Sequence, residues 1–148
     1  MDGHSERVHR KYSPSQAERV QGCYGSTNLL KRVKARPSSP YAIEGTKAHE
    51  VLEAALLNGM RDAETAHREY SSLCCEDLNT NENLFYFAVN MALNHIYSLL
   101  DEYPDAVLFT ECFVDVPSEV APGEAGGFCD VAVWVPSIAT LFVIDYKH

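Results

Sequence analysis

The fold prediction starts from residues 127–146, GFCDVAVWVPSIATLFVIDY. The stretch holds two runs rich in β-branched and aromatic residues, 127–135 and 138–146, a composition typical of β-strands. Because only Pro136 and Ser137 separate the runs, the two strands are expected to be antiparallel neighbours. A turn centred near residues 137 and 138 then places Asp130 opposite Asp145.

A third strand-like run, 107–116, precedes the hairpin and is joined to it by residues 117–126. Short links between the runs predict an antiparallel three-stranded meander. Upstream of it, helical periodicity and capping residues predict four helices, the third of them weak. They are expected at 13–36, 41–58, 62–76 and 81–103. The predicted fold class is therefore α/β in an α+β arrangement, with a flexible leader at 1–12 and one domain at 13–148.

The apolar positions also predict which faces are buried. The second helix carries one apolar stripe, and the fourth helix carries an apolar face. The stripe consists of Ala48, Val51, Leu52, Ala55 and Leu56, and the face of Leu84, Phe87, Ala88, Met91 and His95. Both faces of the last hairpin are apolar, so the sheet is expected to be covered on both sides.

Composition limits the classes of protein that the chain can belong to. Its 148 residues are 46% hydrophobic and 22% charged, which argues against wholesale disorder. No apolar run approaches the roughly 18 residues of a membrane span, and the N-terminus is too polar for a secretory signal. The five cysteines form no CxxC motif, so reduced thiols in the cytoplasm are expected.

Charge is distributed unevenly along the chain. Residues 1–36 carry eight basic and three acidic side chains, a net charge of +5, whereas the rest carries four basic and 18 acidic ones, a net charge of −14. Two interpretations of the basic part remain open: a nucleic-acid contact, or the positive last turn of a helix. The candidate contact residues are Arg19, Lys31, Arg32, Lys34 and Arg36.

Asp130, Asp145 and Lys147 fall on one face of the predicted hairpin. Two facing carboxylates beside a core repel each other, and Lys147 offsets only one of the two charges. A divalent cation such as Mg²⁺ or Mn²⁺ would offset both charges, because it binds carboxylate oxygens. The alternative is a surface pair between Asp145 and Lys147 at a frayed strand end, with Asp130 in a turn.

His49 borders the buried stripe of the second helix, and Glu53 follows it one turn later. A neutral imidazole there could bind a metal, or it could be a hydrogen-bonded residue at the edge of the core. Gly45, inside the same helix, costs about 1 kcal/mol relative to alanine, which suggests close packing or the approach of another backbone.

Three motifs occur in order: Gly45-x-x-x-His49, Gly127-x-x-Asp130 and Asp145-Tyr146-Lys147. Together they resemble the motif set of RecB-type nucleases in the PD-(D/E)XK superfamily. Residues 39–50 are also similar to an uncharacterised phage-encoded branch of that superfamily.

The resemblance implies a restriction-endonuclease-like core and an exonuclease-like, Mg²⁺- or Mn²⁺-dependent activity on DNA, on single strands or duplex ends. It implies that Lys147 orients or activates the attacking water. It further implies that the metal is bound by His49, Asp130, Asp145 and the main-chain carbonyl of Tyr146. Glu111 matches a position often acidic in the superfamily, and it could equally be a solvent-facing strand residue. If the gene is phage-encoded, the expected location is the host cytosol.

The sequence departs from the RecB-type pattern in two ways. No helix with a Gln-x-x-x-Tyr motif follows His148, so the core is expected to be C-terminally incomplete. Its sheet edge could be completed by a second copy or by another chain. Some relatives hold an iron–sulfur cluster, but only Cys23 stands at a comparable position here. No cluster is expected, and Cys23 is expected to pack in the first helix.

Two other functions compete with the nuclease. A catalytically inactive, nuclease-fold DNA-binding or assembly protein would bind metal without cleaving DNA. An acidic protein that mimics DNA would bind a basic partner without metal, and it would leave the Asp130, Asp145 and Lys147 pattern unexplained.

Overall fold

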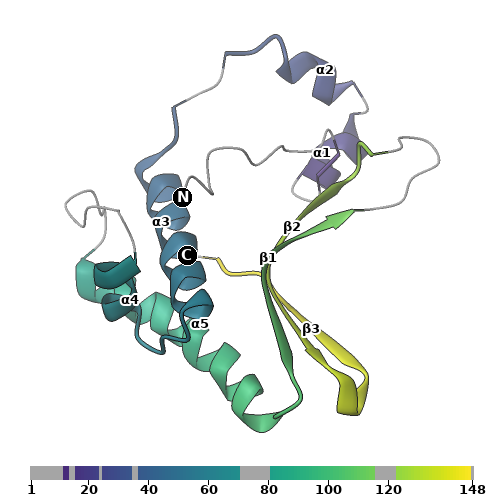
Figure 1. The fold of residues 1–148 in the computed structure, drawn as a ribbon. Coiled ribbons are helices and arrows are strands. Elements are labelled where there is room, and N and C mark those ends of the chain that lie inside the picture. Colours follow the sequence, from purple (N-terminus) through teal and green to yellow (C-terminus); the bar gives the residue numbers. More distant parts are fainter. Residues whose placement is uncertain are drawn as a thin grey trace. The chain divides into compact units, whose positions relative to one another are not determined.

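The structure is a computed structural model that describes residues 12–13, 16–23, 25–34, 37–70, 81–115 and 123–147. Helices come first along the described chain and strands follow (Figure 1). A 3-10 helix, η3, lies between the last two strands. The helices are α1 (Ala17–Gly22), α2 (Ser26–Leu30), α3 (Pro40–Leu57), α4 (Ala63–Tyr70) and α5 (Glu82–Glu102). The strands are β1 (Val107–Asp115), β2 (Gly126–Val135) and β3 (Thr140–Ile144), and η3 spans Pro136–Ile138.

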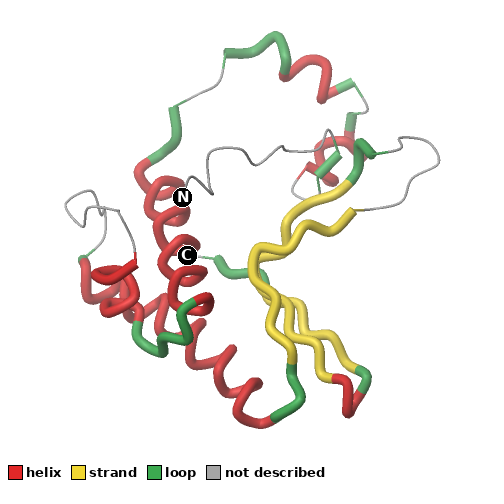
Figure 2. The backbone as a smooth tube through the Cα atoms, in the orientation of Figure 1, coloured by secondary structure: helices red, strands yellow, loops and turns green. Residues whose placement is uncertain are grey.

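The three strands form one antiparallel sheet in the order β1-β2-β3, so β2 is the central strand (Figure 2). Helices pack against this sheet, and the fold belongs to the α+β class that the sequence predicts. Within the described ranges, no helix combines the length and the apolar character that crossing a membrane requires.

The chain forms two compact units. The smaller unit comprises residues 1–36 and 113–128, and the larger unit comprises residues 37–112 and 129–148. Every candidate metal ligand of the sequence lies in the larger unit, and every candidate basic contact residue that the structure describes lies in the smaller one.

Helix α3 packs against both α4 and α5 in the larger unit, and it lies where the sequence predicts it. Ser39 caps its first turn by accepting a hydrogen bond from the Ala42 amide at 3.2 Å, and Pro40 is its first residue. Gly59, with φ of 65°, follows its C-terminus. The predicted stripe is confirmed, since its five members are all buried in the core.

Helix α5 packs with α3 and α4, but through a different face from the predicted one. The predicted face is wrong, because Leu84, Phe87 and Met91 are exposed. The buried positions are Phe85, Tyr86, Val89, Leu93 and Ile96. Both sets recur at helical spacing, so the helix period alone does not distinguish them.

The β2–β3 hairpin has the predicted register, from Val131 opposite Ile144 to Val135 opposite Thr140. Its link is η3 followed by Ala139 in the left-handed region, with φ of 49°. One face of β2 is buried against the helices through Val131, Val133 and Val135. The opposite face of the hairpin exposes Leu141 and Val143, so the expectation of cover on both sides is wrong for the described residues.

The smaller unit contains two short helices where the sequence predicts a single helix over 13–36. That prediction is wrong, because Cys23 is extended between α1 and α2, with φ of −155°. Gly22 and Gly25 flank the break, and glycine is a weak helix former. Cys23 is exposed, so its predicted packing in a helix is wrong as well.

Some predictions fall on residues outside the described ranges. They concern the leader except Tyr12, parts of the first helix including Arg36, the end of the third helix at 71–76, the end of the first strand at 116, and the link at 117–122. Tyr12 forms an isolated parallel bridge with Ala125 in the smaller unit, where the Tyr12 amide donates to the Glu124 carbonyl at 3.0 Å.

Candidate metal centre

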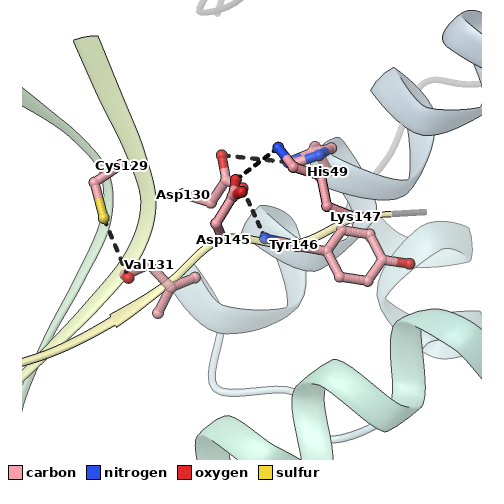
Figure 3. A network of polar contacts seen from close by, with 7 residues as sticks. All are labelled: His49, Cys129, Asp130, Val131, Asp145, Tyr146 and Lys147. Carbon is pink, nitrogen blue, oxygen red and sulfur yellow. Dashed lines mark hydrogen bonds and ion pairs between the residues drawn. The ribbon is translucent and has the colours of Figure 1, made fainter. Parts of the chain in front are cut away.

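His49 reaches the centre from α3. It follows Ala48 of the buried stripe, so its side chain lies at the edge of the core and is 26% exposed. Its Nδ1 atom lies 3.5 Å from Oδ1 of Asp130, a residue of β2. An imidazole from a helix and a carboxylate from the central strand therefore face each other, as Figure 3 shows.

Asp130 is held from two sides. While Oδ1 faces His49, Oδ2 accepts a hydrogen bond from the main-chain amide of Tyr146 at 2.9 Å (Figure 3). Its side chain is 17% exposed, so it is largely withdrawn from solvent. Since Asp130 belongs to β2, the alternative that placed it in a turn is wrong.

Glu111 reaches the centre through an irregularity in β1. Val107 and Phe109 are exposed, so regular alternation would turn Glu111 toward solvent as well. Instead Glu111 adopts φ of 47°, in the left-handed region, and its side chain is partly buried. A left-handed residue inside a strand redirects its side chain in the manner of a β-bulge. The solvent-facing alternative is therefore wrong for Glu111.

The three side chains form a compact donor group. One ligand atom from each of His49, Glu111 and Asp130 lies within 4.8 Å of the others. They line a pocket together with Leu52, Glu53, Leu56 and Val131. The cavity volume is about 10 Å³, close to the roughly 10–15 Å³ that a single water needs. The pocket therefore suits a single ion or water.

Asp145 and Lys147 lie beside this group and not within it. Lys147 Nζ donates to Asp145 Oδ1 at 2.9 Å, and both side chains are mostly exposed. This hydrogen bond lowers the pKa of Asp145, and Asp130 and His49 lower it further. The same contact raises the pKa of Lys147. Asp145 and Lys147 thus form the exposed pair of the alternative interpretation, next to a separate donor group.

Tyr146 lies between these two exposed residues and points the other way, into the core. It is 8% exposed and belongs to the hydrophobic cluster of the larger unit. Burial raises the pKa of its phenol to about 12. Its ring meets the His49 ring edge-on, with centroids 5.3 Å apart and planes at 71°.

Sequence reasoning gave Tyr146 only a main-chain role and missed this ring contact. The contact joins residues nearly a hundred positions apart, so no motif spacing indicates it. The sequence analysis also missed Cys129, which precedes Asp130. The Cys129 thiol donates to the Val131 carbonyl at 3.3 Å. Burial, and then the nearby Cys112 thiol, raise the pKa of Cys129.

The candidate nucleic-acid contacts are exposed wherever they are described. Arg19 belongs to α1, while Lys31, Arg32 and Lys34 follow the last residue of α2. Lys31 is the C-cap residue of that helix. These positions are compatible with both interpretations of the basic segment, because exposed lysine and arginine side chains at a helix C-terminus can also contact phosphates.

Comparison with known proteins identifies the chain at the level of a family. No curated protein and no solved structure is significantly similar to it. The family model described as "Protein of unknown function (DUF2800)" matches residues 9–148. This match covers nearly the whole sequence, and the chain therefore belongs to the DUF2800 family.

Proposed function

We propose that the chain is a metal-dependent DNA nuclease that hydrolyses phosphodiester bonds. The observation that carries the proposal is the convergence of His49, Glu111 and Asp130, from three separate elements, on one small pocket. Two carboxylates this close repel each other when both are ionised. A bound dication offsets that repulsion, and it explains why two carboxylates lie together where packing alone does not.

The donor set fits the proposed metal. Carboxylate oxygens suit Mg²⁺ and Mn²⁺, and the imidazole nitrogen favours Mn²⁺ of the two. His49, Glu111 and Asp130 would hold the ion, with Asp145 and the Tyr146 carbonyl as further candidate ligands. When bound, such an ion polarises a phosphoryl oxygen and lowers the pKa of a coordinated water.

Lys147 supplies a positive charge at the edge of the donor group. Lysine is protonated at neutral pH, so its ammonium is suited to orient a water and to offset the charge that develops on the phosphate. In the structure its ammonium donates to Asp145, the residue that directly follows β3. We assign Lys147 as the catalytic lysine of the proposed reaction.

The substrate class follows from the resemblance and from charge. Single-stranded DNA or duplex ends are the proposed substrates, and the acidic larger unit requires cations to bind a polyanion. The exposed basic residues Arg19, Lys31, Arg32 and Lys34 are the proposed phosphate contacts outside the metal centre.

The test combines metal binding with cleavage. Calorimetric Mn²⁺ titration and cleavage of labelled single- and double-stranded DNA are measured for the wild type, Asp130→Asn and Lys147→Ala. We expect Asp130→Asn to lose Mn²⁺ binding and cleavage, and Lys147→Ala to bind Mn²⁺ but lose at least about 100-fold in rate. Asp101→Asn is the control, because this exposed carboxylate pairs with Arg61 and does not line the pocket.

Four outcomes decide against the proposal. Cleavage without a metal, or equal cleavage by the wild type and Lys147→Ala, removes the assigned roles. Mn²⁺ binding without cleavage by the wild type favours the inactive, nuclease-fold DNA-binding or assembly protein. The absence of both, together with salt-sensitive binding to a basic protein, favours the DNA mimic.

A further inference from the structure

The short segment 145–147 contributes to the candidate centre although it lies beyond the paired residues of β3. Strand β3 ends at Ile144, and the segment 145–147 continues beyond it as a loop toward α3 (Figure 2). In this segment Asp145 and Lys147 are exposed, whereas Tyr146 between them is buried. Tyr146 is therefore the residue of this segment whose side chain packs in the core.

Tyr146 contacts both His49 and Asp130, the two candidate ligands that face each other. Its main-chain amide binds Oδ2 of Asp130, which leaves Oδ1 directed at His49. Its ring packs edge-on against the imidazole of His49. The two ligands come from α3 and β2, and Tyr146 is in contact with each of them (Figure 3).

From these contacts we propose that Tyr146 is a positioning residue of the metal centre, acting through its buried ring. The ring anchors the segment after β3, so that the amide at 146 orients Asp130 while the aromatic edge orients His49. Groups that orient metal ligands in this way typically contribute 10- to 100-fold to metal affinity. In Figure 3 the Tyr146 hydroxyl points away from Asp130, so the ring and not the hydroxyl is the functional part.

This inference rests on the proposed metal centre, and its test uses Mn²⁺ as the probe. Tyr146→Phe keeps the ring and is expected to bind Mn²⁺ as the wild type does. Tyr146→Leu removes the aromatic contact and is expected to bind Mn²⁺ about 10- to 100-fold more weakly. Tyr146→Met, a flexible side chain that fills irregular space, serves if the leucine variant does not fold.

Tyr86→Leu is the matched control. Tyr86 is also 8% exposed in the same hydrophobic cluster, but it contacts Phe85 and His67 instead of His49. Its loss should therefore lower the melting temperature without changing Mn²⁺ affinity. A second readout needs no metal: the ring-current shift of the His49 ring protons in the nuclear magnetic resonance spectrum should persist in Tyr146→Phe and change in Tyr146→Leu.

The outcomes separate this role from the proposed function. Mn²⁺ binding by the wild type with no loss in Tyr146→Leu, or with an equal loss in Tyr86→Leu, overturns the role of Tyr146 alone. An unchanged His49 ring-proton shift in Tyr146→Leu also overturns it. No Mn²⁺ binding by the wild type overturns the metal centre, and the positioning role with it.

Discussion

At the scale of single residues, Glu111 shows how backbone conformation decides whether a side chain belongs to the site. The sequence left Glu111 open, because alternation along β1 directs it to solvent while its acidic character suits a metal ligand. Its φ of 47° brings the carboxylate into the pocket. Non-glycine residues in the left-handed region cost about 1–2 kcal/mol, and such costs occur preferentially at functional sites.

This backbone cost leads to a prediction that separates stability from function. Glu111→Ala and Glu111→Gly both lack the carboxylate, but only glycine adopts a φ of 47° without strain. We expect the glycine variant to be about 1 kcal/mol more stable than the alanine variant by urea unfolding. Both variants should bind Mn²⁺ more weakly than the wild type. If the glycine variant is the less stable of the two, the strain assigned to Glu111 is wrong.

The other site residues differ in how far the sequence could place them. His49 and Asp130 were predictable, because a regular helix and a regular strand carry each to a definite face. Their distance of 3.5 Å was not, because it depends on how α3 packs against β2. Asp145 was placed opposite Asp130, but β3 ends at Ile144, so the strand pairing that the prediction assumed does not extend to Asp145.

At the scale of elements, short-range signals predicted more than long-range ones. The hairpin register followed from a short link between two strand-like runs, and the bounds of α3 from its proline and glycine signals. The buried face of α5 did not follow, because Leu84 and Phe87 are as apolar as residues that the tertiary fold buries. Which of two apolar faces is buried depends on neighbouring elements that the helix sequence does not contain.

Gly45 leads to a prediction about α3. No described atom lies within 4 Å of a Cβ built at this position, so the close packing expected there is wrong for the described residues. Gly45 precedes His49 by one turn on the same face, where open space can admit a substrate. We expect Gly45→Ala to raise the free energy of unfolding by about 1 kcal/mol. We also expect it to lower kcat/KM for DNA roughly tenfold, the effect of about 1.4 kcal/mol.

Gly22→Ala is the matched control for Gly45→Ala. Gly22 is also helical with no described neighbour within 4 Å of a built Cβ, but it lies in α1, outside the larger unit. Its substitution should leave cleavage unchanged. Full cleavage activity in a stabilised Gly45→Ala variant would show that the space beside His49 is not used by the substrate.

The start of α4 provides a prediction about pH. Asp62 accepts hydrogen bonds from the hydroxyl and the amide of Thr65, at 2.6 and 2.8 Å, and these bonds lower the pKa of Asp62. A pKa lowered by folding adds stability above the ordinary value of about 3.9, and that stability is lost as the pH falls through the folded value. We expect Asp62→Ala to cost about 1 kcal/mol at pH 7 in urea unfolding.

The stability difference between the wild type and Asp62→Ala should shrink below about pH 4. Asp62→Asn is the control, because an amide also caps a helix but does not titrate. Its stability relative to the wild type should therefore rise as the solution is acidified. A difference that stays constant from pH 7 to pH 3 would contradict the assigned cause.

At the scale of the whole molecule, the basic part of the sequence, residues 1–36, lies in the smaller unit, which also holds three acidic residues within 113–128. The described candidate basic contacts lie in the smaller unit and the candidate ligands in the larger one. The sequence predicted the uneven charge, because charge can be counted without a fold, but it predicted one domain over 13–148 and not these two units. That a second copy or another chain completes the sheet stays a prediction.

The separation of charge allows DNA affinity to be changed without changing the metal centre. Lys31, Arg32 and Lys34 are exposed just after α2, and their joint replacement by glutamine removes up to three phosphate contacts. We expect weaker binding of single-stranded DNA, a salt dependence shallower by about 0.7 per lost contact, and unchanged Mn²⁺ affinity. Arg61→Gln is the control, because this exposed arginine is held by Asp101 at 2.7 Å. A triple variant with the wild-type salt dependence would instead favour the other interpretation, in which these charges only complement the C-terminal end of a helix.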